Sequence, residues 1–187
     1  MRKDSRRLRD CLGKFSTGVT VVTVQNGDLV HGATVSSFTS VSLDPPLVMV
    51  CLNRRSRMCA RLAGSAFGVN VLAADQRELA LHFAGRSKLE RMVSWEQSDQ
   101  SPMISGCVAH LACSPWASYD GGDHILHLGE VRYFEFRNGE PLVFYGGAFR
   151  ELGGVSDEIA WIGSFDCPTE GIWASKESGL PRSVKSV

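Results

Sequence analysis

Short apolar runs separated by turn-forming residues dominate the hydrophobic pattern of this chain. The run at 47–52 is apolar at every position, and the run at 18–25 carries valines on both sides of the strand; both patterns are typical of strands that are buried on both faces. Glycine stands beside asparagine or aspartate at 26–28 and at 120–123, and both stretches predict tight turns. Strands are therefore predicted at 18–25, 29–42, 47–52, 67–72, 105–119, 124–137 and 142–145.

Three helices are predicted between these strands. Residues 5–15 place Leu8, Cys11, Leu12 and Phe15 at helical spacing on one face. A second helix is predicted at 56–63, with Ser56 as its N-cap, and a third at 75–83. Strands joined mostly by hairpins, with few helices, predict a mainly β protein whose antiparallel strands close into a Greek-key-like barrel with peripheral helices.

Composition narrows the class of protein. The 187 residues suit one main domain, and 20 basic residues balance 20 acidic ones. That balance gives no electrostatic reason to expect a nucleic acid or an anionic membrane as partner. No apolar run approaches the roughly 20 residues of a membrane-spanning helix, and the N-terminus has no apolar signal segment. The six cysteines include no Cys-x-x-Cys pair, so we expect reduced core cysteines in a cytoplasmic protein.

The stretch 32–57 concentrates the candidate binding chemistry. Short hydroxyl side chains crowd its first part, at Thr34, Ser36, Ser37, Thr39, Ser40 and Ser42. Buried hydroxyls without partners cost free energy, so this density predicts either an exposed edge or a wall that binds something polar and flat. Arginines then surround the predicted helix start at Ser56, which suits a phosphate, although a solvated surface loop would look the same. Together these features favour a pocket for a phosphorylated, largely planar ligand.

Five motifs in continuous order resemble one known family. They are GVTVVTV (18–24), GATVSSFTSVSLDPPLVMVCLN (32–53), FGVNVL (67–72), GGDHILHLGEV (121–131) and PLVFYGGAF (141–149). Over residues 12 to 152 the chain is similar to the short-chain flavin reductases, the flavin reductase-like, FMN-binding split-barrel family. The resemblance implies a split β-barrel, a homodimer, and hydride transfer from NADH or NADPH to FMN or FAD. It also implies a partner, the oxygenase of a two-component monooxygenase that uses the reduced flavin.

The resemblance also implies a set of site residues. His124, in Gly122-Asp123-His124, would lie near the nicotinamide and act as the catalytic residue. The isoalloxazine edge would meet hydroxyls of 34–37, and the ribityl and phosphate oxygens would meet residues 53–57. The candidate flavin contacts are Thr34, Val35, Ser36, Ser37, Ser40, Val41, Cys51, Leu52, Asn53, Arg54, Ser56, Arg57, Phe83, Ala84, Ser87 and Phe149.

Several features limit other functions. His124 and His127 lie three apart on a predicted strand, so they point to opposite faces and do not share a metal; no metal site is expected. A hydrogen-bonded structural role is expected for His127. No Gly-x-Gly-x-x-Gly follows a strand, which argues against a Rossmann nicotinamide site. An electron-transfer or oxidase flavoprotein on the same barrel, without free flavin reductase activity, and a purely structural protein remain alternatives.

The resemblance ends near residue 152, and residues 153–187 form a C-terminal extension. Two tryptophans and several isoleucines make it too apolar for a disordered tail as far as about residue 174. We expect this part to be packed and the last dozen residues to be mobile.

Overall fold

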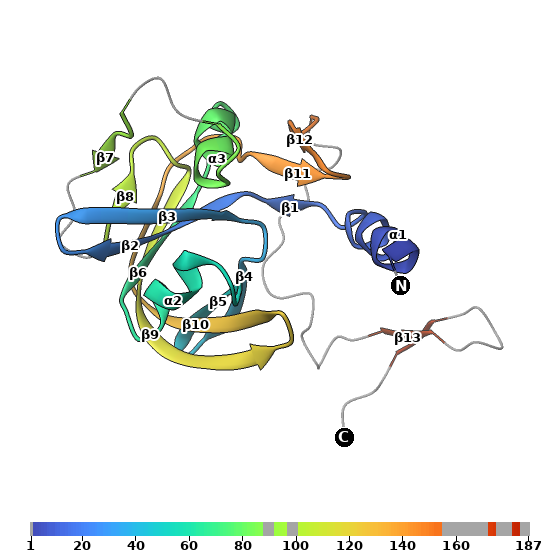
Figure 1. The fold of residues 1–187 in the computed structure, drawn as a ribbon. Helices are drawn as coiled ribbons and strands as arrows, with labels where there is room; N and C mark the ends of the chain where they lie inside the picture. Colours follow the sequence, from blue (N-terminus) through green and yellow to red (C-terminus); the bar gives the residue numbers. More distant parts are fainter. Residues whose placement is uncertain (1, 88–91, 97–100, 155–171, 175–180, 184–187) are drawn as a thin grey trace. The chain divides into compact units, whose positions relative to one another are not determined.

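A seven-stranded antiparallel sheet is the framework of the first of two units in this chain, Met1–Leu152 (Figure 1). The strand order is β3-β2-β6-β9-β10-β5-β4, and every neighbouring pair is antiparallel. These strands are β2 (Thr20–Asn26), β3 (Leu29–Val35), β4 (Thr39–Leu43), β5 (Pro46–Asn53), β6 (Phe67–Val71), β9 (Ala109–Gly121) and β10 (His124–Phe136). The prediction of a mainly β, antiparallel protein is confirmed.

The structure is a computed structural model, and it describes residues 2–87, 92–96, 101–154, 172–174 and 181–183. Smaller sheets join β1 (Thr17–Gly18), β11 (Val143–Tyr145) and β12 (Ala148–Arg150), and pair β7 (Trp95–Glu96) with β8 (Met103–Ile104). In the second unit, Gly153–Val187, a hairpin joins β13 (Ile172–Ala174) to β14 (Pro181–Ser183). The expected packing of the extension and the expected mobility of its end fall mostly outside the described residues.

Three helices accompany the sheet: α1 (Arg2–Leu12), α2 (Arg57–Leu62) and α3 (Arg77–Phe83). The predicted cap of α2 is confirmed, because the Ser56 Oγ accepts a hydrogen bond of 3.0 Å from the backbone N–H of Cys59. The apolar face of α1 is not covered within the described residues, since Leu8 and Leu12 are 58% and 64% exposed. No described helix is both long and apolar enough to cross a lipid bilayer.

The core lies on both faces of β2, as the valines on both sides of this strand predicted. Val22 and Val24 join a cluster with β5, β6 and α2, whereas Val21 joins a second cluster with α3. Helix α3 lies along β3, above it in Figure 1, and its Phe83 ring takes the space of a side chain at residue 32. A Cβ at Gly32 would stand 2.6 Å from that ring, so glycine permits the close approach.

Two sequence predictions about this unit need correction. The strand expected at 29–42 is two strands, β3 and β4, because the chain bends at residues 36–38. At this bend the Ser37 Oγ donates a hydrogen bond of 2.8 Å to the carbonyl of Cys51 on β5 and accepts one of 3.0 Å from its N–H, which ties the segment to β5. The expectation of core cysteines is wrong for Cys11, which is exposed on α1; the five described cysteines are all free.

Candidate functional site

A cavity of about 350 Å³ opens where the end of β3, the end of β5 and the start of β10 meet. Its lining residues are Ala33, Thr34, Val35, Ser36, Ser37, Cys51, Leu52, Asn53, Ser56 and His124. Nine of these ten are residues that the sequence singled out. Ala33 is the lining residue that sequence reasoning missed, because a methyl group carries no chemical signal.

His124 is placed in the cavity by strand pairing. It is the first residue of β10, and it pairs with Asn53, the last residue of β5, and with Gly121 of β9. Its side chain is 43% exposed, and its Nδ1 lies 2.7 Å from the Oδ1 of Asp123. This hydrogen bond is the main cause that lowers the pKa of the Asp123 carboxyl. An ionised carboxylate only accepts hydrogen bonds, so Nδ1 carries the proton and Nε2 is left for a ligand.

Arg54 holds the β9–β10 turn and does not face the cavity. Its Nε donates a hydrogen bond of 2.7 Å to the carbonyl of Gly122, and its Nη2 lies 2.5 Å from the Oδ2 of Asp120. The pKa of Asp120 is lowered by the N–H of Gly122 first and by Arg54 second. The contact of Arg54 with a flavin phosphate stays a prediction, and in the structure its guanidinium binds this turn.

The hydroxyl wall is partly structural. The Oγ1 of Thr34 donates a hydrogen bond of 2.7 Å to the carbonyl of Ala80 on α3, and Ser37 ties its segment to β5. Ser36 is exposed, and its hydroxyl has no hydrogen-bond partner within the described part of the chain. Among the hydroxyls of Thr34, Ser36 and Ser37, only that of Ser36 is thus free for a ligand within the described part of the chain.

Seven further predicted contacts lie outside the lining of this cavity: Ser40, Val41, Arg57, Phe83, Ala84, Ser87 and Phe149. Strand β4 lies at the sheet edge, so Ser40 lines a separate groove and Val41 is exposed. Residues 83–87 begin at the last residue of α3. This end of the helix lies near Gly32, away from the end of β3 that lines the cavity. Phe149 lines a different cavity beside α3.

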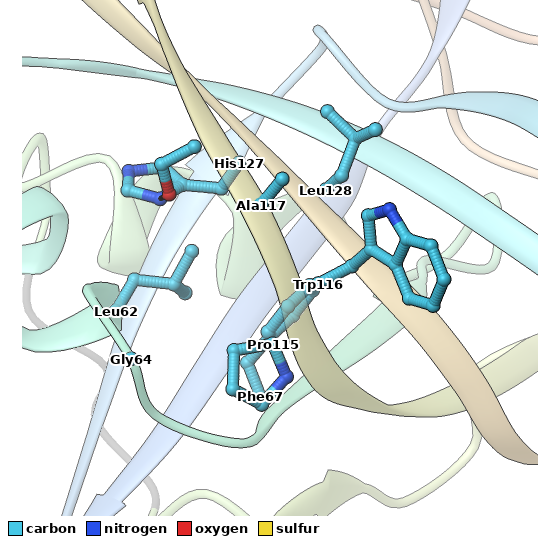
Figure 2. A pocket seen from close by; sticks show the side chains of 9 residues that line it. Leu62, Gly64, Phe67, Pro115, Trp116, Ala117, His127 and Leu128 are labelled. Carbon is cyan, nitrogen blue, oxygen red and sulfur yellow. Dashed lines mark hydrogen bonds between the residues drawn. The ribbon is translucent and has the colours of Figure 1, made fainter.

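His127 is a buried, hydrogen-bonded histidine, and hydrogen bonding at this residue was expected, on the surface or in the interior. It lines a hollow of about 150 Å³. Figure 2 shows it together with Leu62 and Trp116, which line the same hollow. Its Nδ1 lies 3.0 Å from the Ser118 Oγ and its Nε2 lies 3.5 Å from the Cys59 Sγ. Burial lowers the pKa of this imidazole. No group of three or more potential metal ligands is present among the described residues.

The fold and the cavity indicate the class of protein. It is an antiparallel β-sheet protein with a ligand-sized cavity at one end of its sheet. The family profile of the flavin reductase like domain matches residues 12–153. The NADH-dependent flavin reductase of a Rhodococcus species is 42% identical over 158 residues, covering 82% of this chain and 90% of that protein.

A reductase subunit of a flavin-dependent monooxygenase, HsaB of Rhodococcus jostii, is 39% identical over 150 residues, with 78% and 77% of the two chains covered. Among solved structures, the NADH:FAD oxidoreductase SgcE6 of Streptomyces globisporus, in complex with NAD and FAD fragments, has a TM-score of 0.78. It is 42% identical and covers 84% of this chain and 98% of its own. The chain belongs to the flavin reductase like family.

Proposed function

We propose that this protein is an NADH-dependent flavin reductase that reduces FMN or FAD and passes the reduced flavin to a partner monooxygenase. The observation that carries the proposal is the cavity beside His124, which gathers eight of the predicted flavin contacts in a chain of this family. The similarity to HsaB, a reductase subunit of a monooxygenase, supports the partner. The similarity to NADH-dependent reductases supports NADH as the donor.

The residues of the cavity fit a flavin nucleotide. A volume of about 350 Å³ lies within the usual range for small-ligand sites, and Val35 and Leu52 supply apolar surface next to the free hydroxyl of Ser36. Arg55 and Arg57 follow β5, are exposed, and form no ion pair within the described residues. Their guanidinium groups are therefore available for the flavin phosphate, together with Arg54, whose guanidinium also binds the turn.

A bound flavin supplies the hydride-accepting chemistry, and the chain supplies position. Backbone groups of β3 and β5 and the Ser36 hydroxyl hold the ring edge in the proposal. Asp123 fixes the His124 ring, so that Nε2 can hydrogen-bond the carboxamide of the nicotinamide. Arg54 fixes the turn that carries both residues.

A steady-state assay tests the function directly. NADH and NADPH oxidation are followed by absorbance with FMN, FAD and riboflavin in turn. We expect NADH-dependent turnover with at least one flavin. A protein that is inert with every pair would remove the assignment, and tightly retained flavin without NADH oxidation would favour an electron-transfer or oxidase flavoprotein.

A homodimer is part of the proposal. An apolar groove of about 320 Å³ runs along β4, β5, β9 and β10, and Ser40 lies on it. Leu43, Phe134 and Phe136 of this groove are 93%, 66% and 78% exposed, and a monomer rarely leaves such side chains in water together. We expect two chains to pack through this groove. A monomeric mass in sedimentation equilibrium at micromolar concentration would contradict the dimer.

The remaining expectations stand as proposals on the same basis. Strands β3 and β4 form the two edges of the sheet and are joined by residues 36–38, which supports closure of the sheet into a split barrel. Five free cysteines in the described residues support a reducing, cytoplasmic location. We also propose that the flavin reductase domain ends near residue 152. A crystal structure in which the edges of the sheet stay open would contradict the barrel.

A further inference from the structure

A cysteine, a histidine and a serine from three elements form a hydrogen-bonded row outside the lining of the cavity beside His124. The Sγ of Cys59 on α2 lies 3.5 Å from the Nε2 of His127 on β10, and the Nδ1 of His127 lies 3.0 Å from the Oγ of Ser118 on β9. Such a row, in which a base lies between a nucleophile and an orienting group, activates thiols in proteins. The proposed hydride transfer uses none of these three side chains.

The His127 ring can take the proton of the Cys59 thiol. Burial lowers the pKa of this imidazole, so the ring is neutral at pH 7. The Ser118 side chain is exposed, and its hydroxyl accepts the Nδ1–H, which leaves the Nε2 lone pair for the S–H of Cys59. Transfer of that proton gives a thiolate next to an imidazolium, the ion pair that makes a cysteine nucleophilic.

Cys59 differs in this respect from the other described cysteines. Of the five, it is the one whose sulfur contacts an imidazole. Burial raises the pKa of the Cys107 and Cys113 thiols to about 12, so both stay protonated at neutral pH. Cys113 belongs to the same core cluster as Cys59 and is buried to a similar degree, with 3% against 6% of its surface exposed. The two cysteines therefore share their burial and differ in the base.

A hollow beside the imidazole limits the size of a reagent that can reach this row. His127 and Leu62, both labelled in Figure 2, line the hollow together with Ser118, and its volume is about 150 Å³. Leu62 lies on α2, about one helical turn after Cys59. A water molecule occupies about 30 Å³ in the liquid, so the hollow suits a reagent that is little larger than water.

Hydrogen peroxide has this size, and the chemistry of a flavin reductase supplies it. When reduced flavin meets oxygen before it reaches an oxygenase, the flavin loses a hydride equivalent and a proton, and oxygen becomes hydrogen peroxide. Ser56 connects the flavin cavity to the thiol, because it lines that cavity and its Oγ accepts a hydrogen bond of 3.0 Å from the N–H of Cys59. This source of peroxide rests on the proposed function, whereas the reactivity of Cys59 does not.

We propose that Cys59 is a site of oxidation by hydrogen peroxide, with His127 as its base. The Nε2 of His127 takes the thiol proton, the thiolate sulfur attacks one peroxide oxygen, and the O–O bond breaks. The leaving hydroxide takes the proton back from His127, so the products are a sulfenic acid on Cys59 and water. Sulfur gives up the electron pair that the peroxide gains, and a thiol reductant such as dithiothreitol restores the cysteine.

Peptide mapping of the oxidised protein tests the site. The folded, full-length protein is treated with hydrogen peroxide, the peroxide is removed with catalase, and the chain is unfolded in urea with dimedone, which labels sulfenic acids. We expect Cys59 to be labelled at least about 10-fold faster than Cys113, the equally buried cysteine without a base. Equal rates at the two cysteines would overturn the proposal.

Two variants test the role of the base. His127→Gln keeps hydrogen-bonding capacity but takes up no proton, and it should lower the rate at Cys59 by at least about 10-fold while the rates at Cys113 and the exposed Cys11 stay the same. A loosened fold would instead raise the rates at Cys59 and Cys113 together. Ser118→Ala changes an exposed side chain, and it should lower the rate at Cys59 by about 3-fold. A rate at Cys59 that falls in neither variant would overturn the proposal.

Turnover in air tests the source of the peroxide. The protein is incubated with NADH and flavin, and we expect labelling of Cys59 that catalase prevents. Labelling by added peroxide but not during turnover would confirm the site and overturn the flavin as its source. A protein that oxidises no NADH would remove the reductase assignment and leave the result with added peroxide standing.

Discussion

His124 and His127 lie on the same strand, β10, yet the structure surrounds them in opposite ways. His124 opens the strand at the cavity, is 43% exposed, and has one ring nitrogen held by Asp123. His127 is 4% exposed, and both of its ring nitrogens have partners, Ser118 and Cys59. The first histidine has a nitrogen to offer to a ligand, and the second has none.

The difference follows from strand parity and from distance to the strand end. Residues three apart on a strand point to opposite faces, so the two rings cannot serve one cavity. His124 and His127 accordingly line separate hollows. Gly122, two residues before His124, has nothing within 4 Å of the position of a Cβ, whereas α2, which carries Cys59, packs next to His127. Residue type alone therefore does not mark a functional histidine in this fold.

Removal of the His124 side chain should have the largest effect on activity, and it tests the contrast with His127 directly. We expect His124→Ala to lower kcat/KM for NADH by about 100-fold, because the nicotinamide loses its positioning contact. The dissociation constant of the flavin should change by less than about 3-fold, since backbone groups and arginines hold the flavin. Stopped-flow NADH oxidation and flavin fluorescence titration measure the two quantities.

The control for this substitution is His31→Ala, a half-buried histidine on β3 that does not line the cavity. It should keep both NADH turnover and flavin affinity near the wild-type values. An equal loss of NADH turnover and flavin affinity in His124→Ala would mean that His124 binds the flavin and not the nicotinamide.

The matching change at His127 should act on stability and not on turnover. We expect His127→Ala to lower the free energy of unfolding by about 2 kcal/mol, since it leaves a small cavity and removes the partner of Ser118 and Cys59. Urea denaturation gives this free energy, and the KM for NADH should stay within about 2-fold of the wild type. Lost NADH turnover at unchanged stability would show that His127, too, serves the reaction.

Much of the fold was predictable because hydrophobic periodicity and turn residues act locally. Strand β2 is apolar at consecutive positions, and both of its faces are buried in the structure. The break between β3 and β4 was not predictable, because the hydrogen bonds of Ser37 at the bend join it to Cys51, a residue on another strand. The strands β7 and β8 were missed because each has only two residues, too few to show an alternation of apolar and polar positions.

The candidate site shows the same division. Residues 34–37, 51–53 and 56 belong to one sequence motif and its helix start, and the sheet brings them together in one cavity with His124. The contacts of Arg54 could not be predicted, because its partners lie in a turn almost seventy residues further along the chain. Phe83 and Phe149 could be placed only once the direction of α3 was known. The polar motifs thus predicted which residue types form the site. Contacts between residues far apart in sequence decided which of their side chains remain free for a ligand.

The smallest effect that we expect is the part of the pH dependence of the free energy of unfolding that the buried His127 contributes. Burial lowers the pKa of His127 below its ordinary value of 6.5. A histidine with a lowered pKa in the folded state takes up its proton more readily when unfolded, so acid favours unfolding. Its stabilising contribution is complete above pH 6.5 and is lost as the pH falls towards the pKa of the folded state, by at most about 1.4 kcal/mol per pH unit.

His127→Gln isolates this contribution, because glutamine keeps hydrogen-bonding capacity but does not titrate. Urea unfolding at pH 7, 6 and 5 should show a smaller loss of free energy in the variant than in the wild type. All other titrating groups are common to both proteins and cancel in the difference between the two curves. Parallel curves from pH 7 to pH 5 would mean that the His127 ring titrates alike in the folded and unfolded states. Its burial would then not set it apart from an exposed histidine.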